Sequence, residues 1–338
     1  MEYHIYTHKQ PVTLESGAIL PEVRIQYSTA GNRNDSDNNI IWVCHALTAN
    51  SDVESWWPGL VGTDYLYNPE EHFIICANIL SSCYGTTGPT ETNLQTNAPY
   101  FLSFPIVTIR DMVQIHDILR QHLAINTIHT LIGGSLGGQQ AMEWAIQQPS
   151  IFKYLILLST NAFHSPWGIA FNESQRMAID MDPTWKNASL DAGREGLKTA
   201  RAIAMLSYRS YETYVQTQSE EDSSKVDDYR ATTYQHYQGD KLVKRFNCHS
   251  YWYLSKAMDS HHVGRNRKSV QDALDSIQAK TMVIGISTDI LFPVCEQEFL
   301  AKSIPKAQYV CIDSLYGHDG FLTEVEKITD TLMQFYGK

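Results

Sequence analysis

The chain has 338 residues, of which 43% are hydrophobic, so it can bury a large core as one big α/β domain with an insertion. Its net charge of −11 argues against the phosphate contacts that nucleic-acid-binding proteins use, and an anionic small ligand would need a local basic site. The N-terminus lacks the features of a signal peptide, and no apolar run approaches the ~18 residues of a membrane span. We expect a cytoplasmic protein with reduced thiols and with neither a membrane nor a nucleic-acid partner.

Short apolar, β-branched runs alternate with helical patterns along the chain. The runs occupy residues 22–31, 39–47, 73–80, 127–134, 154–160, 281–287 and 308–314. Between the third and fourth runs, residues 109–125 carry apolar side chains at helical spacing, which predicts a crossover helix. This alternation indicates an α/β fold in which a mostly parallel central sheet has helices on both faces.

The pattern changes between residues 164 and 264. No convincing strand occurs there, aromatic residues become dense, and residues 219–228 (SEEDSSKVDD) indicate an exposed polar loop. The strand pattern resumes only at 281–287. We therefore predict a core domain formed by residues 1–163 and 265–338, with residues 164–264 inserted as a helical cap.

A serine stands at a tight corner among glycines. Residues 133–137 (GGSLG) spell GxSxG directly after an apolar strand and directly before a helical pattern that ends before Pro149. In a nucleophile elbow this strained turn exposes the serine hydroxyl, so Ser135 is the candidate nucleophile. The alternative is a Gly-rich turn in which Ser135 caps the following helix.

A serine nucleophile needs a base, and the base needs an acid that fixes its tautomer. In this architecture the order along the chain is Ser, then Asp or Glu, then His, each beyond the carboxyl end of a strand. Asp289 follows the strand at 281–287, and His318 follows the last strand, so we predict these two as acid and base. Asp313 also follows a strand closely and is the competing acid.

Acyl chemistry also needs donors for a tetrahedral oxyanion. We predict the backbone N–H groups of Leu136, directly after the nucleophile, and of Leu47, in the loop that follows the strand at 39–44. His45 in the same loop is expected to give structural support. The adjacent pair His261 and His262 lacks a spaced third ligand, so a hydrogen-bonded pair is favoured over a metal site, and no metal or cofactor is predicted.

Several stretches together resemble the homoserine O-acetyltransferase family of the α/β-hydrolase fold. They cover most of the chain in family order: CHALT (44–48), WWPGLVG (56–62), CYGTTGP (83–89), FPIVTIRDMV (104–113), GGSLGGQQAMEWA (133–145), RAIAMLSYRS (201–210), SYWYLSKAMD (250–259) and GHDGFL (317–322). The resemblance implies transfer of an acetyl group from acetyl-CoA to L-homoserine in methionine synthesis, and a homodimer. Acetyl-CoA would be a co-substrate.

The resemblance also implies roles for single residues. Ser135 matches the nucleophile, Asp289 the acid and His318 the base, while the substrate-binding positions fall on Arg201, Tyr208 and Asp319.

The residues around Arg201 support its role independently. Leu197, Arg201, Met205 and Tyr208 share one helix face, so a permanent charge lies on an apolar stripe and needs a partner. That partner is either the carboxylate of the amino-acid substrate or a nearby Asp or Glu. For Asp319, a helix N-cap competes with binding of the α-ammonium group.

Three alternative functions remain at this point. The same machinery could use succinyl-CoA as donor or L-serine as acceptor. A plain esterase would use water as acceptor, which requires that Arg201 is structurally paired. A non-catalytic binding protein is the third alternative, and the intact set of Ser135, Asp289 and His318 argues against it.

Overall fold

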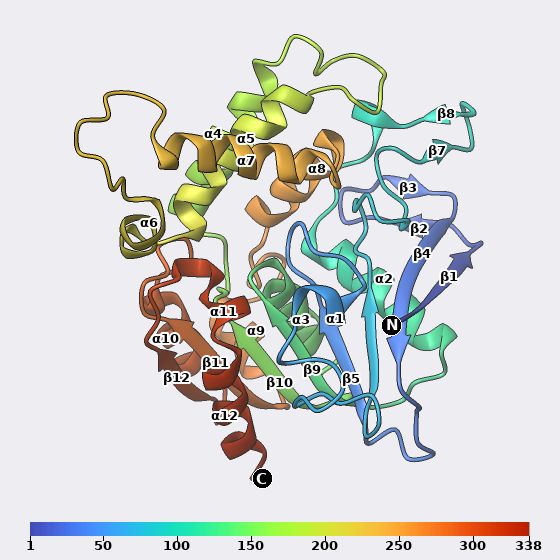
Figure 1. The fold of residues 1–338 in the computed structure, drawn as a ribbon. Coiled ribbons are helices and arrows are strands. Elements are labelled where there is room, and N and C mark those ends of the chain that lie inside the picture. The colour runs from blue at the N-terminus through green and yellow to red at the C-terminus, as the bar shows by residue number, and fades with distance from the viewer. Residues whose placement is uncertain (338) are drawn as a thin grey trace.

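A computed structural model describes residues 1–337 and places an eight-stranded sheet at the centre of the molecule (Figure 1). Its strands lie in the spatial order β1 (Glu2–His8), β4 (Val23–Ala30), β6 (Phe73–Ala77), β5 (Ile40–Cys44), β9 (Ile128–Gly134), β10 (Phe152–Leu158), β11 (Lys280–Ile286) and β12 (Gln308–Ile312). The pairs β1–β4 and β4–β6 are antiparallel, and every neighbouring pair from β6 to β12 is parallel. Two short hairpins join β2 (Val12–Thr13) to β3 (Ile19–Leu20) and β7 (Thr92–Asn93) to β8 (Ala98–Pro99).

The predicted α/β fold with a mostly parallel sheet is confirmed, and each of the seven apolar runs contains a strand of this sheet. Strand β1 was not predicted from the sequence. Within the described part of the chain this strand pairs only with β4, at the edge of the sheet, and its side chains are exposed or half-buried. An edge strand of this kind carries no continuous apolar run, because neither of its faces is fully covered.

Helices cover both faces of the sheet because successive side chains of a strand point to opposite sides. Trp42 and Leu155 face one core cluster, and their neighbours Ile41 and Ile156 face the other. The first face is covered by α2 (Ile109–His122), α3 (Leu136–Gln147), α9 (Val270–Asp275) and α10 (Val294–Ser303). The second is covered by α1 (Val53–Trp56), α11 (Gly320–Thr323) and α12 (Val325–Tyr336).

The crossover helix predicted at 109–125 is α2. It begins after Thr108, whose hydroxyl accepts from the Asp111 N–H while the Asp111 carboxylate accepts from the Thr108 N–H. This reciprocal capping box satisfies donors that the first helical turn would leave unpaired. Met112, Ile115 and Leu119 are buried against the sheet, as their spacing predicted.

Five helices, which we call the cap helices, lie between β10 and α9, within residues 164–264. They are α4 (Pro166–Asp180), α5 (Arg194–Tyr208), α6 (Tyr211–Gln218), α7 (Arg230–Val243) and α8 (Cys248–Asp259). They gather above the sheet in Figure 1, where α5 packs against α4 and α7, and α8 packs against α4. Within residues 164–264, all of which the structure describes, no strand element occurs, in agreement with the sequence pattern.

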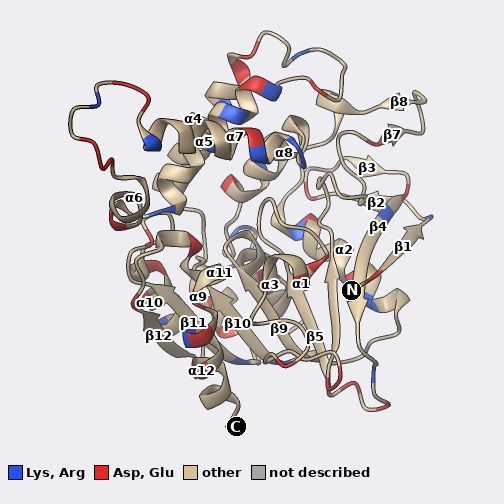
Figure 2. Ribbon diagram, viewed as in Figure 1, with Lys and Arg blue, Asp and Glu red and all other residues tan. Residues whose placement is uncertain are grey.

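The loop 219–228 joins α6 to α7 and is almost entirely exposed, as predicted. It is mostly red in Figure 2 because five of its residues are Asp or Glu: Glu220, Glu221, Asp222, Asp227 and Asp228. Across residues 1–337, no helix combines the length and apolar character that crossing a membrane requires.

Candidate active site

Ser135 occupies the corner between β9 and α3. Its backbone has φ 57° and ψ −127°, a conformation that is costly for a residue with a side chain. The Ser135 N–H donates to the Leu158 carbonyl of β10 at 3.0 Å, which helps to hold the corner in place. The side chain makes no capping hydrogen bond to α3, so the geometry does not support the alternative in which it serves as an N-cap.

Two glycines of the GxSxG sequence permit this corner because backbone atoms approach them closely. A Cβ on Gly137 would lie 2.0 Å from the Cys44 carbonyl oxygen at the end of β5, and one on Gly133 would lie 2.2 Å from the Gly137 carbonyl oxygen. Real Cβ atoms do not approach backbone oxygens so closely, and the backbone cannot move aside as a flexible side chain can. The two glycines therefore let α3 start directly above the strand ends.

Replacing Gly137 with alanine is expected to lower the free energy of unfolding by about 3 kcal/mol, because the new methyl group overlaps the Cys44 carbonyl. Urea unfolding measures this loss. Gly17→Ala is the comparison. A Cβ at this position meets nothing within 4 Å, but the backbone of the new alanine must keep φ 83°. It should cost only about 1–2 kcal/mol, the price of a left-handed backbone. Equal losses in the two variants would show that the close approach is unimportant.

His318 and Asp289 meet beyond the carboxyl ends of the last two strands. The His318 Nδ1–H donates to Asp289 Oδ2 at 2.7 Å, and both residues are buried. Asp289 Oδ1 accepts from the N–H groups of Leu291 and Phe292, each at 2.9 Å. The Phe292 ring also stacks on the His318 imidazole at a centroid distance of 5.1 Å. These contacts hold the imidazole in the tautomer whose Nε2 is free to accept a proton.

Asp313, the competing acid of the sequence analysis, does not contact His318. Its side chain is exposed, and Oδ1 accepts a hydrogen bond from the Ser287 hydroxyl at 3.0 Å. Of the two carboxylates, only Asp289 has the position that an orienting acid requires.

Ser135 and His318 line the same cavity, which has a volume of about 450 Å³. Within residues 1–337, the Ser135 hydroxyl has no hydrogen-bond partner, so it is not hydrogen-bonded to His318 in this ligand-free structure. Catalytic hydrogen bonds are often long in ligand-free enzymes and shorten when substrate binds. The remaining lining residues are Ala46, Leu47, Thr48, Ala49, Asn50, Ser55, Trp56, Arg201, Tyr208, Lys241, Arg245, Asp319, Phe321 and Leu322.

The two predicted oxyanion donors lie at the ends of neighbouring strands, β5 and β9. Among the described residues, neither the Leu47 N–H nor the Leu136 N–H donates to a protein acceptor, so both remain available to a ligand. His45 supports this loop: its Nδ1–H donates to the Ala46 carbonyl at 2.8 Å, and its Nε2 accepts from the Ile79 N–H at 3.2 Å. Burial lowers the pKa of His45 to about 4, so the ring is neutral at pH 7.

Arg201 and Tyr208 come from α5 and reach the same cavity from the cap side. The Arg201 guanidinium lies over the Tyr208 ring at 5.2 Å, and Tyr208 lies 5.8 Å from the His318 ring. Arg201 forms no ion pair with any carboxylate in residues 1–337, and its buried Nε has no hydrogen-bond partner. The geometry therefore does not support the alternative in which a nearby Asp or Glu neutralises this arginine.

Asp319 also lines the cavity, but it has a partner that the sequence analysis missed. Arg209, which follows Tyr208 at the end of α5, forms an ion pair with Asp319 Oδ2 at 2.9 Å. Burial raises the pKa of Asp319, while the nearby Arg209, Arg201 and His318 act in the opposite direction. The Asp319 side chain does not cap α11. No local pattern in the sequence indicated this pair, because its two members are far apart along the chain.

His261 and His262 do not point at a common ligand. His261 Nε2 donates to the Asn161 carbonyl at 3.0 Å, whereas His262 Nδ1 accepts from the Gly264 N–H at 3.1 Å. Each ring is thus part of the local backbone hydrogen bonding. No group of three metal-ligating side chains occurs in the part of the chain that the structure describes.

Comparisons with known proteins agree with this geometry. Residues 39–325 match the family model of the α/β-hydrolase fold, so the chain is an α/β-hydrolase-fold protein. A homoserine O-acetyltransferase of Cyclobacterium marinum is 46% identical over 336 residues, which cover 99% of this chain and 95% of that protein. The chain therefore belongs to the homoserine O-acetyltransferase family, whose members are acyltransferases, as the resemblance in sequence implied.

Solved structures share the fold over nearly the whole chain. The homoserine O-acetyltransferase from Bacillus anthracis has a TM-score of 0.91 at 23% identity, covering 100% of this chain and 98% of that one. Esterase E22 has a TM-score of 0.90 at 22% identity, covering 99% of both chains. At such identities the likeness concerns the fold alone. Transferases and esterases share this scaffold, so the acceptor must be argued from the site.

Proposed function

We propose that this protein transfers an acetyl group from acetyl-CoA to the side-chain hydroxyl of L-homoserine through an acetyl-Ser135 intermediate. The proposal rests on one cavity that contains both a serine with its histidine–aspartate pair and an unpaired arginine. Ser135 lies beside the buried His318–Asp289 pair, and the unpaired Arg201 guanidinium reaches the same cavity from α5. The first feature is suited to acyl transfer, and the second to an acceptor that carries a carboxylate.

In the first half-reaction, His318 Nε2 removes the Ser135 hydroxyl proton as Oγ attacks the thioester carbonyl. The N–H groups of Leu47 and Leu136 donate to the oxyanion, and Asp289 stabilises the imidazolium through Nδ1. The carbon–sulfur bond then breaks, and His318 returns the proton to the departing CoA thiolate. The product is an ester between the acetyl group and Ser135.

In the second half-reaction, homoserine enters after CoA has left. His318 Nε2 takes the proton of the homoserine hydroxyl, whose oxygen attacks the acetyl-Ser135 carbonyl. The ester bond to Ser135 breaks, and Oγ recovers its proton from His318, which restores the enzyme. This sequence is ping-pong catalysis, and it requires that the intermediate meets homoserine before it meets water.

The acceptor is recognised by charges from both parts of the fold. Arg201 presents a planar guanidinium that suits the α-carboxylate, and the Tyr208 ring packs against the face of this guanidinium. Asp319 binds the α-ammonium group of homoserine, and the ion pair with Arg209 holds the Asp319 carboxylate in place. We propose that residues 164–264 act as a lid domain over the core formed by residues 1–163 and 265–338, limiting the access of water.

Intact-protein mass spectrometry tests this proposal. After brief exposure to acetyl-CoA or succinyl-CoA, the modified peptide is mapped, and the adduct is then chased with homoserine, serine or buffer. We expect an acetyl adduct on Ser135 that persists in buffer and is discharged by homoserine. Rapid loss in buffer would instead identify an esterase, labelling only by succinyl-CoA would change the donor, and discharge by serine alone would change the acceptor.

Replacing Arg201 with glutamine is expected to lower kcat/KM for homoserine by about 100-fold, because a buried charge-assisted contact to the carboxylate is lost. Arg201→Lys should retain only part of the parent kcat/KM, since a single ammonium group lacks the planar fork with which a guanidinium binds both carboxylate oxygens. Acetylation of Ser135 by p-nitrophenyl acetate should remain close to that of the parent protein. Arg230→Gln, at an exposed position on the same cap, is the matched control. An unchanged kcat/KM in Arg201→Gln would refute the assignment.

We further propose a homodimer in the cytoplasm. The family resemblance supports the dimer, and the use of acetyl-CoA, an intracellular metabolite, supports the location. Light scattering coupled to size-exclusion chromatography measures the mass in solution, and a mass of one chain would contradict the dimer.

A further inference from the structure

Three cations lie close together at the end of α7 and just after it: Lys241, Lys244 and Arg245, which we call the basic rim. All three are exposed, and none forms an ion pair with a carboxylate in residues 1–337. Other arginines of the chain, such as Arg24 and Arg267, are paired with glutamates. In a chain of net charge −11, an unpaired group of cations stands out as the local basic site that an anionic ligand needs.

The basic rim lies between two cavities. Lys241 and Arg245 line the cavity that contains Ser135, while Lys244 and Arg245 line a second one of about 310 Å³. Arg245 therefore borders both cavities.

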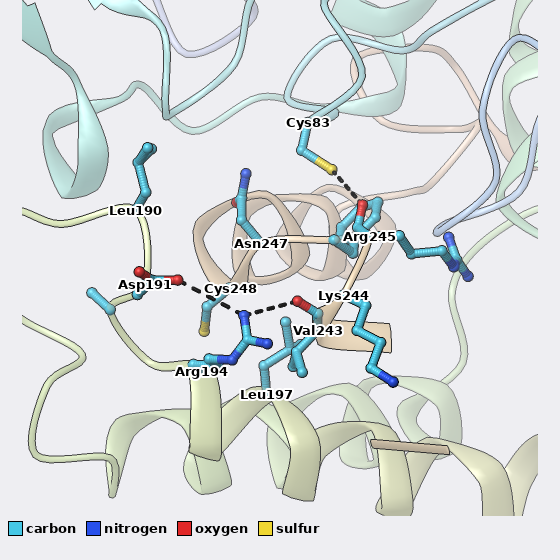
Figure 3. A pocket seen from close by; sticks show the side chains of 12 residues that line it. Cys83, Leu190, Asp191, Arg194, Leu197, Val243, Lys244, Arg245, Asn247 and Cys248 are labelled. Carbon is cyan, nitrogen blue, oxygen red and sulfur yellow. Dashed lines mark hydrogen bonds and ion pairs between the residues drawn. The ribbon is translucent and has the colours of Figure 1, made fainter. Parts of the chain in front are cut away.

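Contacts of Arg245 fix its guanidinium beside the loop that holds the predicted oxyanion donor Leu47. It donates to the Thr48 carbonyl, to the Thr48 hydroxyl at 3.3 Å and to the Tyr84 hydroxyl at 2.9 Å. In Figure 3 this side chain extends away from the second cavity, whose other wall carries Arg194. A cation is thus held at the mouth of the active-site cavity without a carboxylate partner.

The second cavity combines apolar and basic walls. It lies between the start of α5 and the connection from α7 to α8, and Leu197 and Val243 supply apolar surface (Figure 3). Phe246 is a further apolar residue of its lining. Arg194 donates to the Val243 carbonyl at 3.0 Å and lies 3.8 Å from the largely exposed Asp191. Apolar surface next to cations and the Asn247 amide matches a purine base that carries phosphate groups.

From these observations we infer that the basic rim and the second cavity bind the phosphorylated adenosine end of the CoA thioester. Lys241 and Arg245 contact the diphosphate at the mouth of the active-site cavity, and Lys244 contacts the 3′-phosphate while the adenine occupies the second cavity. This places the pantetheine arm in the active-site cavity, with its thioester at Ser135. The inference rests on the proposed use of an acyl-CoA donor.

A purely structural role for these lysines leads to different expectations. Cations at the C-terminal end of a helix interact favourably with its dipole, and Lys241 lies in the last turn of α7. If the lysines only stabilised α7, replacing them with neutral residues would lower the melting temperature and leave the KM for every donor unchanged.

A series of donors separates the parts of the proposed site. Acetyl-CoA, acetyl-dephospho-CoA, acetyl-phosphopantetheine and S-acetyl-N-acetylcysteamine carry the same thioester and progressively fewer phosphate groups. We expect KM to rise along the series for the parent protein, with kcat far less affected. A KM that does not depend on the phosphate groups would overturn the inference.

Variants then assign the phosphate groups to residues. Lys241→Gln/Lys244→Gln should raise the KM for acetyl-CoA at least about tenfold and leave the KM for S-acetyl-N-acetylcysteamine and for homoserine unchanged. Lys244→Gln alone should remove the preference for acetyl-CoA over acetyl-dephospho-CoA. The control is Lys268→Gln/Lys302→Gln, which removes the same charge from two exposed positions that line neither cavity.

The outcomes distinguish this inference from the proposed function. If the double variant transfers acetyl groups from acetyl-CoA with the parent KM, the basic rim does not bind the donor, although the proposed function stands. If neither acetyl-CoA nor S-acetyl-N-acetylcysteamine acetylates Ser135 in the parent protein, the proposed function fails first. An equal rise in KM for all four donors would indicate a change in the active-site cavity and would also overturn the inference.

Discussion

Ser135→Ala is expected to abolish the acetyl-enzyme and to lower kcat for acetyl transfer by at least about 10⁴-fold. Alanine removes the only atom on this corner that can form the ester, while it keeps the Cβ that the corner already accommodates. The mass of the protein after exposure to acetyl-CoA should then equal that of the unexposed protein, and coupled assays of CoA release should fall to background.

Two controls make this result specific. The unfolding midpoint of Ser135→Ala should stay close to that of the parent protein or rise slightly, because Oγ makes no hydrogen bond within residues 1–337. Ser55→Ala removes another hydroxyl from the lining of the same cavity and should leave an adduct on Ser135. An adduct of unchanged yield in Ser135→Ala would contradict the mechanism.

Asp289→Asn is expected to lower kcat by about 10³–10⁴-fold with little change in structure. The amide oxygen can still accept from the Leu291 and Phe292 N–H groups, which leaves the amide nitrogen facing His318 Nδ1. Because that nitrogen donates, the imidazole must adopt the tautomer that protonates Nε2. The base then has no lone pair for the Ser135 proton.

Asp313→Asn is the matched control for this variant. It makes the same chemical change after the next strand, at an exposed carboxylate that within residues 1–337 accepts only from Ser287. We expect the kcat of Asp313→Asn to equal that of the parent protein when acetyl transfer to homoserine is measured through the release of CoA. Similar losses in both variants would mean that the orienting acid has been wrongly assigned.

Much of the fold could be predicted from the sequence because buried parallel strands are continuous apolar runs. The strands β9, β10 and β11 are of this kind, each buried along almost its whole length. The location of the site residues followed from the same fact, since the carboxyl ends of parallel strands lie at one edge of the sheet. Edge strand β1 escaped prediction because its exposed side chains carry no such run.

The sequence could not predict contacts that depend on how distant segments meet. Arg245 and Thr48 are 197 residues apart, and nothing in either segment alone indicates that they touch. The pair between Arg209 and Asp319 likewise requires the end of α5 to lie beside the turn that carries His318. Such pairs are set by packing of the cap helices on the sheet, which no local pattern encodes.

The division of the site between sheet and cap has an evolutionary consequence. Strand ends supply the residues proposed for acyl-enzyme formation, Ser135, Asp289 and His318, whereas α5 supplies Arg201 and Tyr208, two of the three residues proposed for the acceptor. Changes within one inserted helix can therefore exchange an amino-acid acceptor for another nucleophile while the acylation step is preserved.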